Sequence, residues 1–125
     1  MSDGDRSQAD LREISDPRML IDEVFVRLRE GAEPERFRGE RGVFRFLIAT
    51  PEGEVSRFVI VEDEQCRVTA EPEQEPGVTL SLSLDDFVAL ATGELSGPDA
   101  FISGRLTVGG DLFLAMRWGD WFGAR

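Results

Sequence analysis

The sequence lacks four residue types: it contains no histidine, lysine, tyrosine or asparagine, so all 14 of its basic residues are arginine. Without histidine there is no common general base near neutral pH and no imidazole metal ligand. Without lysine there is no amine for a Schiff base. Because most familiar catalytic arrangements are thereby excluded, we expect a protein that is not an enzyme and that uses no metal or cofactor.

Two chemical features nevertheless need an interpretation. The 25 acidic residues leave a hydrolase that uses only carboxylates formally open. Asp85 and Asp86 are adjacent, but they fall in the first turn of a predicted helix, where carboxylates stabilise the helix dipole, so we interpret them as structural. The single cysteine, Cys66, has no partner for a disulfide and no flanking metal or redox motif, and we expect it to fill space in a strand.

Charge and hydropathy restrict the partners and the location. The formal net charge of -11 repels nucleic-acid phosphates, and the arginines form no basic run, so we predict no nucleic-acid binding. The same charge disfavours anionic membranes and predicts at most transient membrane contact. No apolar run approaches the roughly 18 residues of a membrane span, and the N-terminus has no secretion signal. We therefore predict a cytoplasmic protein.

The length of 125 residues predicts one domain. Residues 1–14 are polar and charged without sustained periodicity and are predicted to be a flexible leader, followed by a single domain over residues 15–125. The first element is a helix that begins at Asp16-Pro17, which suit the cap and the first helical position, and ends before Gly31. A charged loop is predicted over residues 33–41.

A β-hairpin is predicted next. Residues 43–49 and 55–61 are rich in β-branched and aromatic residues, and a turn at residues 51–54 joins them. Alternation places three apolar side chains of the first strand on one face, and we expect two from the second strand to match them. These are Phe44, Phe46 and Ile48, matched by Phe58 and Ile60.

The remaining elements complete an α+β pattern. We predict a strand over 66–71, a loop over 72–77, a strand over 78–83, a helix from Leu84 closed by Gly93, a short helix carrying residues 100–102, a strand over 105–108 that Gly109-Gly110 breaks, and an apolar helix after Asp111. This order predicts helices packed on a mainly antiparallel sheet. The apolar residues exceed what a tight core needs, so either the core is generous or a cavity exists.

Two stretches, residues 78–95 and 100–116, resemble the sterol carrier protein type 2 domain family. The distinctive parts are the alternating strand 78–83, the Asp86-Phe87 helix closed by Thr92-Gly93, the Ala100-Phe101 pair before Gly104, and the Gly110-Asp111 turn into Ala115-Met116. The resemblance covers roughly residues 16 to 118. It implies a twisted five-stranded sheet covered by helices, with an internal hydrophobic tunnel that binds sterols, fatty acyl chains or related lipids.

The resemblance also assigns a function and a site. It implies a lipid-binding protein that holds one apolar ligand for intracellular transfer or presentation. The predicted ligand-binding residues are Phe46, Ile48, Phe87, Leu90, Phe101, Ile102, Leu112 and Met116.

Two other functions stay open. In the first, the chain is an accessory factor that presents a hydrophobic intermediate, such as an isoprenoid quinone precursor, to partner enzymes. Alternatively it is a ligand-free interaction module that docks a partner through Trp118, Trp121 and Phe122. The sequence does not name the ligand, the protein partners or the oligomeric state.

Overall fold

The fold is given by a computed structural model, which describes Leu11 and residues 13–122. Leu11 is 5% exposed and Ile14 packs against the same core, so the packed domain reaches back to Leu11. The rest of the predicted leader lies outside the described residues, and its flexibility stays a prediction.

The helices and strands alternate as an α+β fold. They are α2 (Pro17–Gly31), the short 3-10 helix η2 (Pro34–Phe37), β1 (Gly42–Thr50), β2 (Gly53–Glu62), β3 (Gln65–Thr69), β4 (Val78–Ser83), α3 (Leu84–Thr92), α4 (Gly97–Ile102), β5 (Thr107–Gly110) and α5 (Leu112–Phe122). The strands form one five-stranded sheet in the order β3-β2-β1-β4-β5. The β1–β4 pair is parallel and the other pairs are antiparallel. The predicted five-stranded, mainly antiparallel sheet covered by helices is confirmed.

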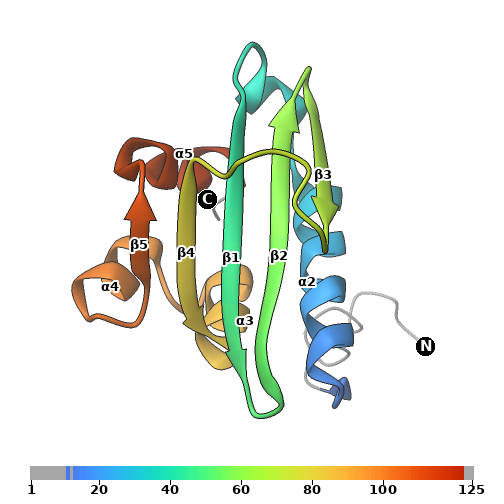
Figure 1. Cartoon of the computed structure of the whole chain (residues 1–125), viewed down its shortest axis with the longest axis vertical. Helices are drawn as coiled ribbons and strands as arrows, with labels where there is room; N and C mark the ends of the chain where they lie inside the picture. Colours follow the sequence, from blue (N-terminus) through green and yellow to red (C-terminus); the bar gives the residue numbers. More distant parts are fainter. Residues whose placement is uncertain (1–10, 12, 123–125) are drawn as a thin grey trace.

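Three long helices cover one face of the sheet. Figure 1 shows α2 behind β2 and β3, α3 behind the lower ends of β1 and β4, and α5 behind their upper ends. The other face is crossed by residues 70–77, which run from β3 at one edge to β4 on the far side of β1 (Figure 1). The N–H of Gly77 donates to the carbonyl of Val43 at 2.9 Å and fixes the end of this crossing. The core therefore lies between the sheet and the helices.

The strand register corrects one detail of the predicted hairpin. Phe44 is opposite Val59 and Ile48 is opposite Val55, so these valines, and not Phe58 and Ile60, share the helix-covered face. Phe58 and Ile60 point to the other face and are 6% and 1% exposed. Since side chains alternate along a strand, a register one residue away from the expected one exchanges the two faces completely.

The predicted helix caps are present. The Asp16 side chain accepts a hydrogen bond from the N–H of Arg18 at 3.0 Å, with Pro17 in the first turn. Ser83 Oγ accepts from the N–H of Asp86 at 3.1 Å and begins α3, and Gly93 ends it with φ 85°. These contacts satisfy backbone groups that have no partner within the helix.

Two connections differ from the sequence analysis. The predicted loop at residues 33–41 contains η2, and its Phe37 is 2% exposed in the core. The last strand does not end before Gly109-Gly110 but includes both, because Gly110 pairs with Val78 and Gly109 with Thr79. A Cβ at Gly110 would lie 2.7 Å from the Gly77 carbonyl oxygen, so only glycine allows this approach of the two strands.

Candidate functional site

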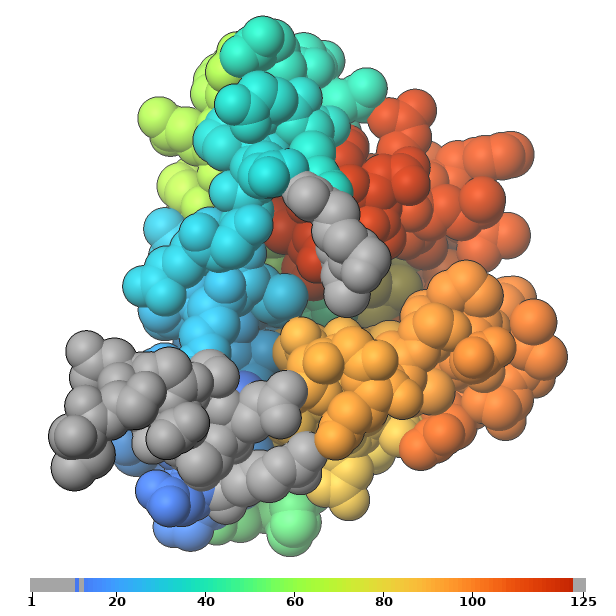
Figure 2. Space-filling model, turned by 180° about the vertical axis from the view of Figure 1, so that it is seen from behind, coloured from blue at the N-terminus to red at the C-terminus, as the bar shows by residue number. Residues whose placement is uncertain are grey.

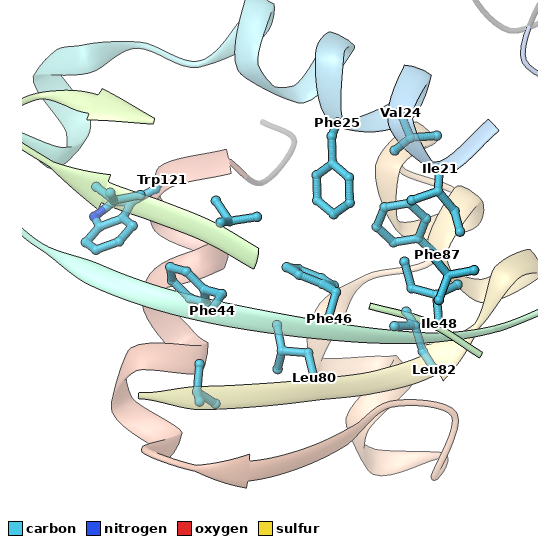
Figure 3. Close-up of a cluster of buried hydrophobic side chains, with 14 of the residues drawn as sticks. Ile21, Val24, Phe25, Phe44, Phe46, Ile48, Leu80, Leu82, Phe87 and Trp121 are labelled. Atoms are coloured by element: carbon cyan, nitrogen blue, oxygen red, sulfur yellow. The ribbon is translucent and has the colours of Figure 1, made fainter. Parts of the chain in front are cut away.

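Half of the predicted ligand-binding residues lie together in the core. Phe46 and Ile48 of β1 and Phe87 of α3 are 3%, 0% and 2% exposed. Leu90, one turn further along α3, is partly buried and packs against the core to which these three belong. Figure 3 shows Phe46, Ile48 and Phe87 in the layer between the sheet and α2.

The other half lie on the surface. Phe101 and Ile102 of α4 are 47% and 82% exposed, and Leu112 and Met116 of α5 are 49% and 63% exposed. The structure therefore divides the predicted set into an inner and an outer group. That all eight line one tunnel stays a prediction.

An aromatic cluster fills the inner site, which is the apolar layer between the sheet and the helices that holds the inner group of predicted residues. The aromatic cluster comprises Phe25, Phe44, Phe46, Phe87, Trp118 and Trp121. Phe25 of α2, Phe46 and Phe87 form a triangle with ring centroids 5.1 to 5.8 Å apart. Their mostly edge-to-face and tilted arrangement is the favoured one for aromatic pairs.

Trp118 of α5 extends the aromatic cluster toward the C-terminus. Its ring lies 4.8 Å from that of Phe46 and 5.1 Å from that of Phe44, edge to face in both cases. Trp121 lies 5.9 Å from Phe44 and is 2% exposed, whereas Trp118 is only partly buried. Trp118 is thus the member of the cluster that joins the buried rings to the more exposed side of the helical layer.

The two tryptophans also test the docking patch that the interaction-module alternative requires. An interaction module would present Trp118, Trp121 and Phe122 to solvent, but all three pack against the core. The docking patch predicted from these residues is therefore wrong. Their rings contact Phe44 of β1 and Phe37 of η2, because the C-terminal helix folds back on the sheet (Figure 1).

Several residues of the site were not in the predicted set. They are Phe25, Phe44, Leu80, Leu82, Trp118 and Trp121. Two signals in the sequence point to them: Phe25 follows Ile21 by one helical turn, and Leu80 and Leu82 alternate with serine in β4. Leu80 is opposite Phe46 and Leu82 is opposite Ile48 in the parallel β1–β4 pair. That pair joins distant parts of the sequence, so spacing alone does not reveal it.

The helical layer is hollowed above the sheet. Figure 2 shows the hollow between α2 on one side, α5 above and α3 with α4 below, with atoms of β4 visible at its bottom. Several apolar side chains of α3 and α5 pack against the core and are only partly buried, among them Leu90, Leu114, Ala115 and Trp118. The apolar interior is therefore close to solvent on this face.

Two further depressions lie beside α2. One has a volume of about 370 Å³ and is lined by Val26, Arg29, Glu30, Ala32, Pro34, Phe37, Glu64 and Cys66. The other, of about 260 Å³, is lined by Arg27, Leu28, Gly31, Ala32, Glu33, Arg36, Trp121 and Phe122. Both mix charged and apolar side chains, so neither has the apolar walls that a lipid chain requires.

The reactive side chains show no catalytic arrangement in the part of the chain that the structure describes. Burial raises the pKa of the Cys66 thiol to about 11, so the thiol stays protonated and unreactive near neutral pH. Asp86 forms an ion pair with Arg105, 2.9 Å from Oδ1 to Nη2, which gives it a structural role. Within residues 13–122, no group of three or more acidic or cysteine side chains is placed to hold a metal ion.

Comparison with known proteins identifies the family. The model of the SCP-2 sterol transfer family matches residues 21–122. The chain belongs to this family, whose members bind or transfer lipids. The inner site described above, apolar and enclosed between helices and sheet, fits that class of protein.

The similar proteins include a relative that is much longer than this chain and two solved sterol carrier protein structures. Hydroxysteroid dehydrogenase-like protein 2 of Danio rerio is 31% identical over 97 residues, which cover 78% of this chain but only 23% of the relative. Among solved structures, the crystal structure of sterol carrier protein 2 like 2 from Aedes aegypti superimposes with a TM-score of 0.66 at 24% identity, covering 82% of this chain and 96% of that one. The solution structure of palmitated SCP2L2 from Aedes aegypti gives 0.63 at 25% identity, covering 80% and 87%.

Proposed function

We propose that the protein binds one apolar ligand, a fatty acyl chain or a sterol, between the helical layer and the sheet, and carries or presents it without chemistry of its own. The observation that carries the proposal is the position of the aromatic cluster. The cluster lies between the sheet and an apolar helical layer whose side chains are in part only partly buried, and the chain belongs to a lipid-binding family. The relative described as palmitated supports an acyl chain as one ligand.

The ligand enters by displacing part of the aromatic cluster. Phe46, Ile48 and Phe87 form the fixed wall, because they sit on the sheet and on the capped helix α3. Trp118 is the movable side, since it is the one member of the aromatic cluster that is only partly buried; its helix also makes polar contacts at the surface. Among those contacts, Arg117 pairs with Glu40 at 2.6 Å and Arg36 donates to the Asp120 carbonyl at 3.2 Å.

The energetics suit a reversible carrier. Burying about 16 methylene groups from water gains on the order of 13 kcal/mol, from which association subtracts several. A membrane shields the same chain from water equally well, so transfer between membrane and protein is close to balanced. Apolar walls select by volume and not by hydrogen bonding, and we propose a correspondingly broad ligand range.

The test uses the two tryptophans of the chain. Native mass spectrometry of the purified protein is expected to show one bound lipid, and solvent extraction then identifies it. The delipidated Trp121→Phe variant keeps Trp118 as its one tryptophan, and a fluorescent fatty acid should quench its emission with saturation at one ligand per chain. The matched Trp118→Phe variant should take up the ligand with a smaller change in emission. A protein that is purified bare and takes up neither fatty acid nor sterol disproves the proposal.

A second candidate function is presentation of the ligand to a partner enzyme. This function is favoured because the chain aligns with 23% of the length of a dehydrogenase-like relative, in which the matched domain is part of a longer protein. Affinity purification under native conditions separates the two functions. A free carrier is recovered alone with its lipid, whereas an accessory factor is recovered with enzymes that act on an apolar substrate. For either function we propose a cytoplasmic location; no helix in the described part of the chain is long and apolar enough to cross a membrane.

A further inference from the structure

Exposed apolar side chains are concentrated on α4 and α5. Seven large apolar side chains are exposed among the described residues, and five of them belong to these two short helices. We call the five the α4–α5 patch: Phe101 (47% exposed), Ile102 (82%), Leu112 (49%), Phe113 (79%) and Met116 (63%). Scattered apolar residues on a surface need no explanation, but such a concentration marks an interaction site.

Helix α5 carries apolar residues on both of its sides. At about 100° per residue, Leu112, Phe113 and Met116 fall on one side of the helix, and Leu114, Trp118 and Trp121 on the opposite side. The second group packs against the core, and the first is exposed. Asp120 falls in the same arc as the exposed group but one turn beyond Met116, so the outer apolar side is confined to the first half of α5, and this part is suited to a second apolar phase.

The size and shape of the patch favour a lipid surface over a protein. The five side chains expose roughly 600 Å² in total, less than the about 800 Å² that each partner contributes to a standard interface. Helices α4 and α5 lie at opposite ends of β5 (Figure 1), whose four residues span about 13 Å. Two protruding groups separated in this way are both reached by a flat, deformable bilayer, and they form no groove for a peptide.

The charge distribution points the same way. Residues 97–122, which span α4, β5 and α5, contain two arginines and three aspartates, a formal charge of only -1, so the other residues carry -10 of the total of -11. Both arginines are ion-paired, Arg105 with Asp86 and Arg117 with Glu40, so this segment presents little free charge of either sign. The patch can therefore approach phospholipid headgroups, while the acidic remainder is repelled by a membrane of net negative charge.

We propose that the α4–α5 patch docks the protein on a zwitterionic lipid bilayer, with α5 lying between the bilayer and the aromatic cluster. This inference rests on the proposed function, because the bilayer is then the source and the acceptor of the carried lipid. One side of α5 inserts into the membrane surface, and Trp118 on its other side closes the inner site. Docking therefore acts on the same helix that the ligand must displace.

The test is flotation with phospholipid vesicles, using variants that remove exposed apolar side chains. The wild type is expected to float with phosphatidylcholine vesicles and to bind less when phosphatidylserine is added. Phe113→Gln on α5 and Ile102→Gln on α4 should each lower the bound fraction at least tenfold, because each loses a fully inserted apolar side chain. Met19→Gln is the matched control, since Met19 is 62% exposed but lies on α2. It should bind like the wild type.

Three results overturn the docking proposal. The first is that the wild type does not float, and the second is that Met19→Gln lowers binding as much as Phe113→Gln. The third is a dimer, detected by sedimentation, that Phe113→Gln dissociates, because the patch would then be a self-association surface. Uptake of a fluorescent fatty acid from solution, measured on the wild type and on Phe113→Gln, separates the two proposals. Uptake without vesicle binding refutes docking alone, and vesicle binding without uptake refutes the proposed function and leaves docking supported.

Discussion

Asp22 of α2 and Arg57 of β2 form a two-point ion pair across the boundary between the helices and the sheet. Arg57 Nε lies 2.8 Å from Asp22 Oδ1 and Nη2 lies 3.3 Å from Oδ2, and Nη1 donates to the Ser56 carbonyl at 2.8 Å. Arg57 is 8% exposed and stands opposite Phe46, in a face that is otherwise apolar. The pair fixes α2 against the wall of the inner site.

The two partners of this ion pair should respond unequally to substitution. The Arg57 side chain is 10% exposed and that of Asp22 is 56% exposed. Asp22→Asn leaves a mostly buried guanidinium without its counterion and should lower the free energy of unfolding by about 2 kcal/mol. Arg57→Met leaves a carboxylate that water can solvate and places apolar atoms in the core, so the loss should stay below about 1 kcal/mol. Urea denaturation measures both, and an equal or reversed order would contradict the burial argument.

Gly110 and its neighbour offer a matched pair of substitutions. Gly110→Ala adds a Cβ that would lie 2.7 Å from the Gly77 carbonyl oxygen, at φ 100°. We expect a loss of about 3 kcal/mol, since clash and backbone strain combine. Gly109→Ala meets nothing within 4 Å and should change stability by less than about 0.5 kcal/mol. Thermal unfolding followed by circular dichroism compares them, and similar melting temperatures would show that β5 does not require glycine at this position.

Phe87 tests how tightly the inner site is packed. It is 2% exposed and its ring lies 5.1 Å from Phe25 and 5.8 Å from Phe46. Phe87→Ala should cost about 3 to 5 kcal/mol, the usual effect of deleting a buried aromatic ring. Phe113→Ala, at a position that is 79% exposed, is the control and should stay within about 0.5 kcal/mol of the wild type. A small loss at Phe87 would mean that the site is already loosely filled.

A polar cluster around Glu62 predicts a specific acid sensitivity. Glu62 accepts hydrogen bonds from Gln74 at 3.5 Å, Arg41 at 3.3 Å and Arg67 at 3.2 Å. The Gln74 hydrogen bond, with further hydrogen bonds from Arg41 and Arg67 and the nearby charge of Arg67, lowers the pKa of the Glu62 carboxyl below its usual value of 4.5. Its pKa is thus lower in the folded than in the unfolded protein, so the stabilisation is complete above pH 4.5 and is lost as the pH falls through the folded-state pKa.

The substitution Glu62→Gln should remove this dependence. The urea midpoint of the wild type should exceed that of Glu62→Gln near pH 7, and the difference should shrink below pH 4.5. Glu75→Gln is a control, because Glu75 is exposed on the same crossing segment, residues 70–77. A difference between wild type and Glu62→Gln that is constant from pH 7 to pH 3 would disprove the role of the carboxylate charge.

Local chemistry made most of the elements predictable. The caps at Asp16 and Ser83 and the αL glycine Gly93 act on neighbouring residues, so the sequence alone locates the ends of α2 and α3. The strands β1, β2 and β4 follow from alternation and β-branched residues. The short 3-10 helix at Pro34–Phe37 was missed because charged residues surround its one buried side chain, Phe37.

The inner site was predictable only in part. Phe46 and Ile48 carry an alternating apolar pattern and were correctly expected to lie on one face of their strand, whereas their role with Phe87 as a tunnel wall stays a prediction. The partners Phe25, Leu80 and Trp118 join them from other elements through contacts with no fixed sequence spacing. The outer residues Phe101, Ile102, Leu112 and Met116 have the same apolar character as the inner ones, so hydropathy does not distinguish a core wall from an exposed patch.

The sequence by itself determined the chemistry of this protein: no imidazole, no lysine amine, an acidic surface, a family pattern over residues 78–116 and the caps of its helices. The tertiary structure decided which apolar residues meet. The parallel β1–β4 pair sets Leu80 opposite Phe46, and the return of α5 buries Trp121 while it exposes Phe113. The physical reason is that caps and alternation act between neighbours in the chain, whereas burial depends on which distant segments cover a side chain.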